Sequence, residues 1–318
     1  MDPNVAGSNP VDRPLLSRGP LNLLQAIILG ILQGITEFFP ISSSAHLKWG
    51  RYLLGLPDGE QWLSFDLACH AGTWLALVYF LRKDVWQVLR SIRQIALFTL
   101  ALVPLVPAYF LLKPLRLALS APQYTGYCLL FTALLLLLAS RKPNPATSPL
   151  SWQRSLPPAA ERGEGKLKRS GPNERDIPCE RKASEEDRFI EAAASPAFLS
   201  MKNVLCVGIA QALALIPGIS RSGATIATGR FCGWNWTSAA RFSFLLAVPT
   251  ILGGEMLESL KGNHSMDVPI CLTGLLASLL VGLVSVRFMF WFYERGIVKP
   301  FVWYCTVFGL LYLWTFHG

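Results

Sequence analysis

Long apolar blocks constrain the fold of this chain more than any other feature. A helix needs about 20 predominantly apolar residues to cross a lipid bilayer, with a range of about 17 to 25. A large soluble helical protein is the alternative, but its helices would show polar faces at helical spacing, and Cys128–Ala139 has almost none. We therefore predict an all-α polytopic membrane protein. The blocks are Ser64–Leu81, Gln94–Leu112, Thr125–Ser140, Val268–Trp291 and Pro300–Phe316.

The net charge of +9 does not indicate a nucleic-acid partner. The basic residues fall mainly between the apolar blocks, where topology rules place them in membrane proteins. The seven cysteines are scattered, with no Cys-x-x-Cys pair and no Cys/His cluster of zinc spacing. We therefore expect neither a structural metal nor a disulfide framework.

Two polar regions divide the chain. Residues 1–20 carry several prolines and no hydrophobic period, which indicates a flexible tail. Residues 141–200 are rich in charged residues, Pro and Ser, and such a composition cannot bury enough apolar surface to fold alone. We interpret this second region as a disordered cytoplasmic linker that catalysis does not need. It separates two membrane parts, residues 21–140 and 201–318.

The two membrane parts resemble one another in sequence. Five identities share an offset of 178 residues, and both copies carry a polar run between apolar flanks. Repeats in membrane proteins are often inverted, with a binding site near the midplane where interrupted helices meet. We therefore predict two inverted repeats. The paired residues are Gly30 and Gly208, Ile31 and Ile209, Gln33 and Gln211, Ser42 and Ser220, and Ser44 and Ser222.

Proline interrupts each copy. One helix is expected to stop before Pro40 and another before Pro217, because the residue before proline is pushed out of helical geometry. Serines follow both breaks and are good N-caps, so a second helix is expected to open after each one. We interpret each motif as a re-entrant hairpin that precedes three transmembrane helices, and two kinked full spans are the alternative. No small-residue cleavage site follows the first apolar run, so we expect no cleaved signal peptide.

The distribution of Lys and Arg predicts the orientation. If the block 64–81 runs from outside to inside, Arg82, Lys83 and the linker lie inside. The outer loops then hold few basic residues. These are Lys113, Arg116 and Lys261.

The first polar run contains a carboxylate, three hydroxyls and an imidazole. Ionisable groups at membrane depth are expensive and indicate a functional site by default. Glu37 is a candidate general base or metal ligand, or else the ion-pair partner of an arginine in the second half. Ser43 and His46 share one helix face, and serine beside histidine is typical of an activated nucleophile. His46 could instead accept the phosphoryl group itself, and N-capping is the structural alternative for the serines. Gln33, Ser42 and Ser44 are expected beside them.

The second polar run offers an anion clamp. Arg221 presents a planar fork of donors that suits phosphate oxygens, and the helix N-terminus after Pro217-Gly218 adds backbone N–H groups. Arg221 could equally neutralise Glu37, and a resting pair of this kind could open to a substrate. Ser220, Ser222 and Thr225 are expected to assist it. The two runs together predict a site of phosphoryl transfer.

Five further polar residues lie near these runs. His70 sits inside an expected span, and whether it reaches the same cavity is open. Arg230 and Arg241 are interpreted as interfacial anchors. Glu255 and Glu258 lie near the end of a span and are expected to be solvated.

The two polar runs resemble the signatures of the undecaprenyl-diphosphate phosphatase family, also called the bacitracin-resistance protein family. The first signature is Glu/Gln-x-x-x-Glu followed by Pro-x-Ser-Ser-x-x-His, and it matches Gln33–His46. The second is Pro-Gly-x-Ser-Arg-Ser-x-x-Thr, and it matches Pro217–Thr225. The segments Phe65-Asp66 and Ala239–Pro249 are also similar to the family. Ala45 departs from it where glycine is common, and the linker is longer than expected.

The resemblance implies a bacterial inner-membrane enzyme that hydrolyses undecaprenyl diphosphate to the monophosphate. This step recycles the lipid carrier of cell-wall synthesis and confers bacitracin resistance. The resemblance also implies a site open to the outer face and a divalent cation, Mg²⁺ or Ca²⁺, with Glu37 as the essential carboxylate and a metal ligand. Ser43 or His46 would be the nucleophile and Arg221 would bind phosphate. A homodimer is left open.

Two other functions compete with this interpretation. A polyprenyl-phosphate transporter or flippase would use similar repeats and a midplane anion site, but it has no need of Ser43 and His46 beside a carboxylate. A different class of lipid phosphatase would place a histidine some residues after the Ser-Arg motif. None follows Arg221 before His264.

Overall fold

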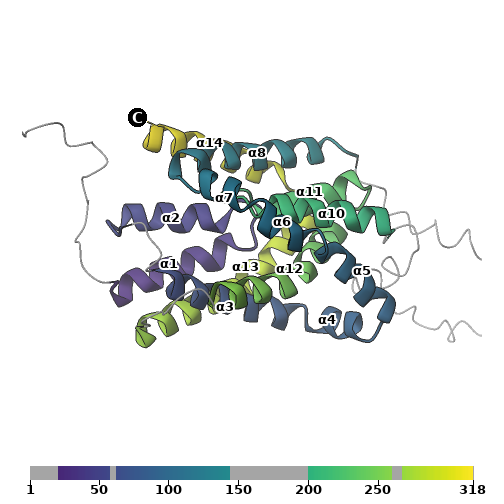
Figure 1. Cartoon of the computed structure of the whole chain (residues 1–318), viewed down its shortest axis with the longest axis horizontal. Helices are drawn as coiled ribbons and strands as arrows, with labels where there is room; N and C mark the ends of the chain where they lie inside the picture. The colour runs from purple at the N-terminus through teal and green to yellow at the C-terminus, as the bar shows by residue number, and fades with distance from the viewer. Residues whose placement is uncertain (1–20, 58–61, 144–199, 260–266, 318) are drawn as a thin grey trace, which may run out of the picture.

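The computed structural model describes residues 21–57, 62–143, 200–259 and 267–317. In these ranges every regular element is a helix, which confirms the predicted all-α class (Figure 1). The predicted tail 1–20 and most of the predicted linker, residues 144–199, lie outside the described residues. The helices are α1 Leu23–Thr36, α2 Ser43–Leu53, α3 Leu63–Phe80, α4 Arg82–Leu89, α5 Ile92–Leu102, α6 Leu105–Leu111, α7 Lys113–Leu119, α8 Pro122–Ser140, α10 Met201–Leu213, α11 Arg221–Phe231, α12 Trp236–Ser259, α13 Val268–Glu294 and α14 Lys299–His317.

Both predicted breaks are present. α1 starts at a capping box in which Asn22 and Gln25 each bind the other's backbone N–H, an arrangement that satisfies two otherwise unpaired donors. It ends at Thr36, and α2 opens after Pro40, at Ser43. In the same way α10 ends before Pro217, and α11 opens just after it. Each polar run therefore lies at a helix–turn–helix junction.

Five helices are long and apolar enough to cross a membrane. Three of them, α3, α8 and α13, follow the predicted blocks closely, whereas α12 was not among those blocks. The predicted block Gln94–Leu112 is interrupted, because α5 ends at Leu102 and α6 begins after Pro104. α14 covers the predicted block Pro300–Phe316 as a helix, but it is not among the five candidate spans. The span prediction is thus confirmed for most of the described chain and incomplete at α14.

Helices of the two halves pack directly against each other. α13 packs along both α1 and α3, and α14 packs along α8. Small residues permit the α1–α13 contact, since a Cβ at Gly34 would lie 2.9 Å from the backbone oxygen of Ser278. Close approach through glycine is typical of helix pairs in membranes. This packing brings the two polar runs together from opposite halves of the chain.

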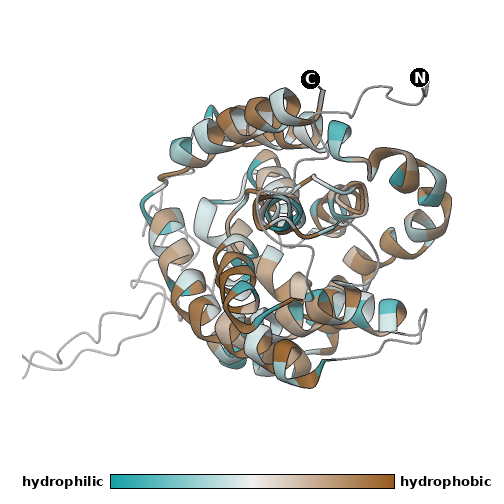
Figure 2. Ribbon diagram, turned by 90° about the vertical axis from the view of Figure 1, so that its left-hand side faces the viewer, coloured by the Kyte–Doolittle hydropathy of each residue, from teal (hydrophilic) through white to brown (hydrophobic). Residues whose placement is uncertain are grey.

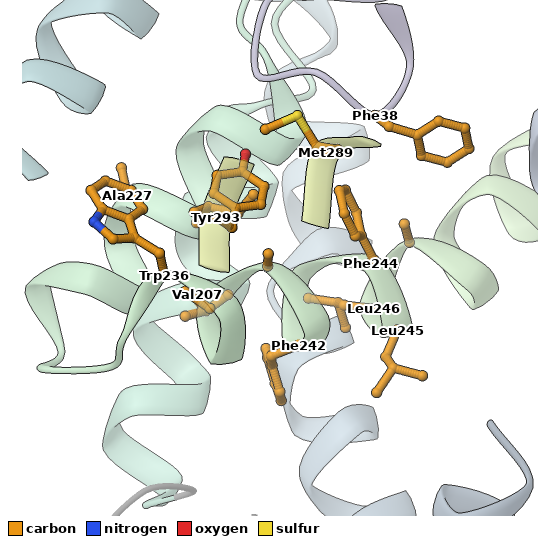
Figure 3. Close-up of a cluster of buried hydrophobic side chains, with 14 of the residues drawn as sticks. Phe38, Val207, Ala227, Trp236, Phe242, Phe244, Leu245, Leu246, Met289 and Tyr293 are labelled. Atoms are coloured by element: carbon orange, nitrogen blue, oxygen red, sulfur yellow. The ribbon is translucent and has the colours of Figure 1, made fainter. Parts of the chain in front are cut away.

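A buried aromatic and aliphatic cluster supports the first turn. Phe38 is 1% exposed and lies edge-on to Phe244 of α12, with 6.0 Å between ring centroids. Met289 of α13 belongs to the same cluster (Figure 3). Phe38 directly follows Glu37, so this packing fixes the turn that carries the carboxylate.

Apolar side chains also cover the outside of the helices. Figure 2 shows hydrophobic residues along many of the helices, and Leu280, Val284 and Trp314 are each more than half exposed. Apolar exposure on this scale would be unfavourable in water, and it fits helices that face lipid.

Candidate functional site

A cavity of about 410 Å³ lies where the two polar runs meet. This volume is within the range of small-molecule sites, roughly 300 to 1,000 Å³. The first turns of α3 and the last turns of α12 contribute to its wall. These ends lie at the opposite end of the long axis from the end of α8 and the start of α10, which flank residues 144–199 (Figure 1). The polar lining residues are Thr36, Glu37, Ser42, Ser43, Ser44, Asp66, His70, Ser220, Arg221, Ser222, Thr250, Glu255 and Glu258.

Glu37 is the hub of the hydrogen bonds in this cavity. Its Oε1 accepts a charge-assisted bond from Arg221 Nη2. Its Oε2 accepts from Ser43 Oγ at 2.8 Å and from Gln33 Nε2 at 3.0 Å. The Glu37 side chain is only 4% exposed, and a buried carboxylate requires such partners because its desolvation is costly. The predicted approach of Glu37 to Arg221 across the two halves is therefore confirmed.

The serine triplet at the start of α2 does not cap that helix. Ser42 occupies the N-cap position with φ 69° and ψ 94° and makes no side-chain capping bond, so the expected serine cap is wrong here. Its hydroxyl instead lies 3.3 Å from that of Ser44. Ser43 is the first residue of α2, and its hydroxyl is held on Glu37. All three hydroxyl residues line the cavity.

The second polar run combines capping with contacts to the first. Ser220 Oγ accepts from the Gly223 N–H at 3.1 Å, so here the expected cap is present. Ser222 Oγ donates to the backbone oxygen of Phe39 at 3.2 Å, which ties α11 to the first turn. Thr225 does not line the cavity, and its hydroxyl lies 2.6 Å from that of Ser243. Ser220 and Ser222 are thus placed at the site, whereas Thr225 supports the helix that carries Arg221.

His46 lies outside the cavity, and the prediction that it faces the cavity beside Ser43 is wrong. Its Nδ1 lies 2.7 Å from the backbone oxygen of Ser42, and its Nε2 lies 2.7 Å from the hydroxyl of Tyr304. The ring stacks on Phe308 with 4.4 Å between centroids and is 4% exposed. Both ring nitrogens are therefore engaged, and His46 anchors α2 to α14.

His70 lies in the cavity beside Glu37, which answers the question that the sequence left open. Its Nδ1 lies 2.9 Å from Gln33 Nε2 and 3.6 Å from Glu37 Oε2. The side chain is 29% exposed and lines the cavity. α3 thus adds an imidazole that comes from neither polar run.

Three carboxylates at the cavity were not predicted as site residues. Asp66 lies one turn before His70 on α3 and accepts from Arg51 Nη1 at 2.8 Å. Glu255 and Glu258 were expected to be solvated, but both line the cavity and are partly buried. Asp66 and His70 are four residues apart on α3, and Glu255 and Glu258 are three apart on α12. Each of these two pairs therefore shares one helix face. That spacing was the available signal, but it does not reveal what the face contacts.

The two predicted arginine anchors are also in contact with the protein interior. Arg230 is 1% exposed, and its guanidinium donates to the backbone oxygen of Lys142 at 2.9 Å. Arg241 pairs with Asp84 of α4 at 3.4 Å. The interpretation of Arg230 as an interfacial anchor is therefore wrong, because it joins the end of α8 to α11.

The described residues do not form a protein-only metal site. Among them, no three His, Cys, Asp or Glu side chains lie close enough to hold a metal ion together. Both oxygens of Glu37, the predicted ligand, already accept hydrogen bonds.

Most of the chain matches known proteins. The family model for bacitracin resistance protein BacA matches residues 26–170 and 174–311. An undecaprenyl-diphosphatase of Protochlamydia amoebophila is 33% identical over 298 residues, which cover 91% of this chain and 97% of that protein. Another from Christiangramia forsetii is 32% identical over 307 residues, with 91% and 97% covered. A third from Rubrobacter xylanophilus is 33% identical over 306 residues, with 89% and 94% covered.

Proposed function

The chain belongs to the bacitracin resistance protein BacA family, and on that premise we propose that it hydrolyses undecaprenyl diphosphate to undecaprenyl phosphate and inorganic phosphate. The relatives named undecaprenyl-diphosphatase match this chain over nearly their whole length. The reaction recycles the lipid carrier of cell-wall synthesis and underlies resistance to bacitracin. The apolar exterior supports a multi-pass membrane enzyme.

One observation carries the proposal: Glu37 holds a serine hydroxyl and an arginine at the same time. A nucleophile within hydrogen-bond reach of a base is the requirement for covalent catalysis. A guanidinium beside them suits the charge of a diphosphate. Of the two candidate nucleophiles, Ser43 meets this requirement, whereas both nitrogens of His46 are engaged outside the cavity.

The reaction follows from these positions. Ser43 Oγ attacks the terminal phosphorus while its proton passes to Glu37 Oε2. The bond between that phosphorus and the bridging oxygen breaks, and the bridging oxygen leaves on undecaprenyl phosphate. Water then displaces Ser43 Oγ, which recovers its proton from Glu37, and inorganic phosphate is released.

Substrate binding also prepares the base. Arg221 is 27% exposed in its side chain, so it can turn toward a diphosphate in the cavity. When it does, Glu37 loses the neighbouring cation and becomes free to accept the proton of Ser43. Ser220 and Ser222 flank Arg221 and add hydroxyl donors on the same side.

A divalent cation would enter with the substrate. Mg²⁺ is commonly bound through one or two carboxylates together with substrate phosphates, and Glu255 and Glu258 offer carboxylates at the cavity. Such an ion would offset repulsion between the diphosphate and the acidic wall. The protein-bound steps above do not depend on it. Binding of Mn²⁺ with and without inorganic pyrophosphate, followed by electron paramagnetic resonance, tests this role apart from activity.

The architecture supports a site that opens to the outer face of the bacterial inner membrane. α4 carries Arg82 and Lys83 at the same end of the molecule as the helix ends that flank residues 144–199 (Figure 1), and basic residues favour the inner side. The cavity lies toward the other end. In this arrangement α1–α2 and α10–α11 are re-entrant hairpins of two inverted repeats.

Phosphate release tests the proposal. Protein purified in detergent should release phosphate from undecaprenyl diphosphate, and Ser43→Ala should not. Added chelator should lower the rate, because the divalent cation would offset repulsion between the diphosphate and the acidic wall. Absence of release by the intact protein, together with transfer of the lipid across vesicle membranes, would favour the flippase alternative.

A further inference from the structure

The hydrogen bonds of Gln33 determine the proton position on His70. Gln33 Nε2 lies 3.0 Å from Glu37 Oε2, and a carboxylate oxygen only accepts. The amide nitrogen must therefore face Glu37, since the amide oxygen in that place would repel it. The same nitrogen lies 2.9 Å from His70 Nδ1, so its second hydrogen is donated to the imidazole.

This contact selects one tautomer of His70. A neutral imidazole has one protonated and one bare nitrogen, and the partner of one nitrogen sets the state of the other. Because Nδ1 accepts from Gln33, Nε2 carries the hydrogen. Among the described residues, Nε2 has no hydrogen-bond partner in the protein, and His70 lines the cavity with its side chain 29% exposed.

We propose that His70 is a further catalytic residue, whose Nε2–H donates a hydrogen bond to the diphosphate group in the cavity. This inference rests on the function proposed above. Gln33 is then a positioning residue, because it holds the imidazole through Nδ1 and aims Nε2–H away from Glu37. The diphosphate receives a neutral donor from α3 and a charged donor from Arg221 of α11.

A neutral donor is useful in this cavity. The cavity wall already contains the carboxylates Asp66 and Glu255. Arg221 is paired with Glu37 until substrate arrives. A fixed donor aimed at phosphate oxygens costs no reorganisation when charge shifts during the reaction, and removal of one such donor lowers kcat by about 10²- to 10³-fold.

Two conservative variants separate catalysis from a structural role. Glutamine can place its amide nitrogen, a donor, near the position of His Nε2. Asparagine reaches only the position of Nδ1, where its amide oxygen would accept from Gln33. We expect His70→Ala to lose about a hundredfold in kcat, His70→Gln to recover most of it, and His70→Asn to recover little. If His70 served only to hold Gln33 through Nδ1, Asn would rescue and Gln would not, and that result would overturn the proposal.

Thr250→Val is the matched control. Thr250 also lines the cavity, but its hydroxyl donates to the backbone oxygen of Leu246 at 2.6 Å. The variant should keep wild-type kcat and the wild-type elution profile. A loss equal to that of His70→Ala would mean that any change in the wall disturbs the site, and it would count against a specific role of His70.

A binding experiment tests His70 independently of turnover. The chain has four histidines, so the ¹⁵N imidazole resonances of labelled protein can be assigned, with His70→Gln identifying those of His70. We expect a protonated Nε2 and a bare Nδ1, and a shift of the Nε2 signal when inorganic pyrophosphate is added. If the intact protein released no phosphate yet the signal shifted, the proposed function would fail and the phosphate contact of His70 would stand. An unchanged Nε2 signal would refute the contact.

Discussion

The two halves share a backbone pattern and differ in the chemistry they place on it. Adding 178 to the first residues of α1 and α2 gives the first residues of α10 and α11. α2 and α11 are each 11 residues long. The residues at two equivalent positions near the cavity differ between the halves. Ser43 opens α2 where Arg221 opens α11, and Glu37 corresponds to Leu215. One half therefore supplies the proposed nucleophile and base, and the other supplies the arginine that pairs with the base.

The halves also differ in how the turn is built. In the first half the positive φ falls on Ser42, a residue with a side chain, and the N-cap bond is missing. In the second half the positive φ falls on Gly218, and Ser220 caps α11. Unfavourable backbone geometry concentrates where function requires it. We infer that the conformation of the first turn serves the proposed catalysis, whereas that of the second turn serves stability.

The largest expected difference in kcat is between the alanine variants of Ser43, which opens α2, and Ser220, which caps α11. Ser43→Ala removes the proposed nucleophile, and we expect kcat to fall at least about a thousandfold, within the losses seen when catalytic residues are removed. Ser220→Ala removes a cap, which lowers unfolding free energy by about 1 kcal/mol, while kcat falls much less. Phosphate release and thermal unfolding in detergent measure both. Equal losses of kcat in the two variants would contradict the division between the halves.

Arg221→Lys should have the next largest effect. Lysine keeps the charge but loses the planar fork, and we expect kcat to fall about a hundredfold, as for loss of one transition-state donor. The fold should persist, because lysine can still pair with Glu37. Size-exclusion chromatography controls for folding. Turnover close to wild type in this variant would remove Arg221 from phosphate binding.

The glutamines Gln33 and Gln211 occupy the same position in the two halves but have opposite surroundings. Gln33 bonds to Glu37 and His70, whereas neither amide atom of Gln211 has a partner in the described part of the chain, although the residue is 3% exposed. We expect Gln33→Leu to lower kcat about tenfold, the lower end for loss of a group that supports acid–base chemistry. Gln211→Leu should leave kcat unchanged and raise the unfolding free energy by about 1 kcal/mol, since an unpaired buried amide is costly. A fall in stability for Gln211→Leu would show that this amide has a partner.

Much of the fold was predictable because its causes are local. Apolar length identified most of the spans, and Pro40 and Pro217 placed the breaks near their observed positions. The pairing of Glu37 with Arg221 was also predictable, because two isolated charges in an apolar setting stabilise each other. These inferences need only the chain near each motif.

The errors have a common cause in contacts between remote segments. His46 turned away from the cavity because Tyr304 and Phe308, on the last helix, enclose its ring. His70 and Glu255 reached the cavity because α3 and α12 pack beside α1 and α11. Residue spacing predicts which side chains share a helix face, but it does not predict what that face contacts.

The smallest expected effect tests the difference between the turns. Ser42 holds φ 69°, a region where glycine pays no steric penalty, and relief of such strain is worth about 1 kcal/mol. Ser42→Gly should therefore raise the midpoint of thermal unfolding by a few degrees, and its backbone oxygen can still receive His46 Nδ1. Gly218→Ala should act in the opposite direction, because a Cβ there would lie 2.8 Å from Cys128 Cβ at φ 95°. If Ser42→Gly stabilised the protein yet lowered kcat, the strained serine would serve the orientation of Ser43. If Ser42→Gly instead destabilised the protein, the hydroxyl contact with Ser44 would outweigh the strain, and the first turn would owe its shape to hydrogen bonding.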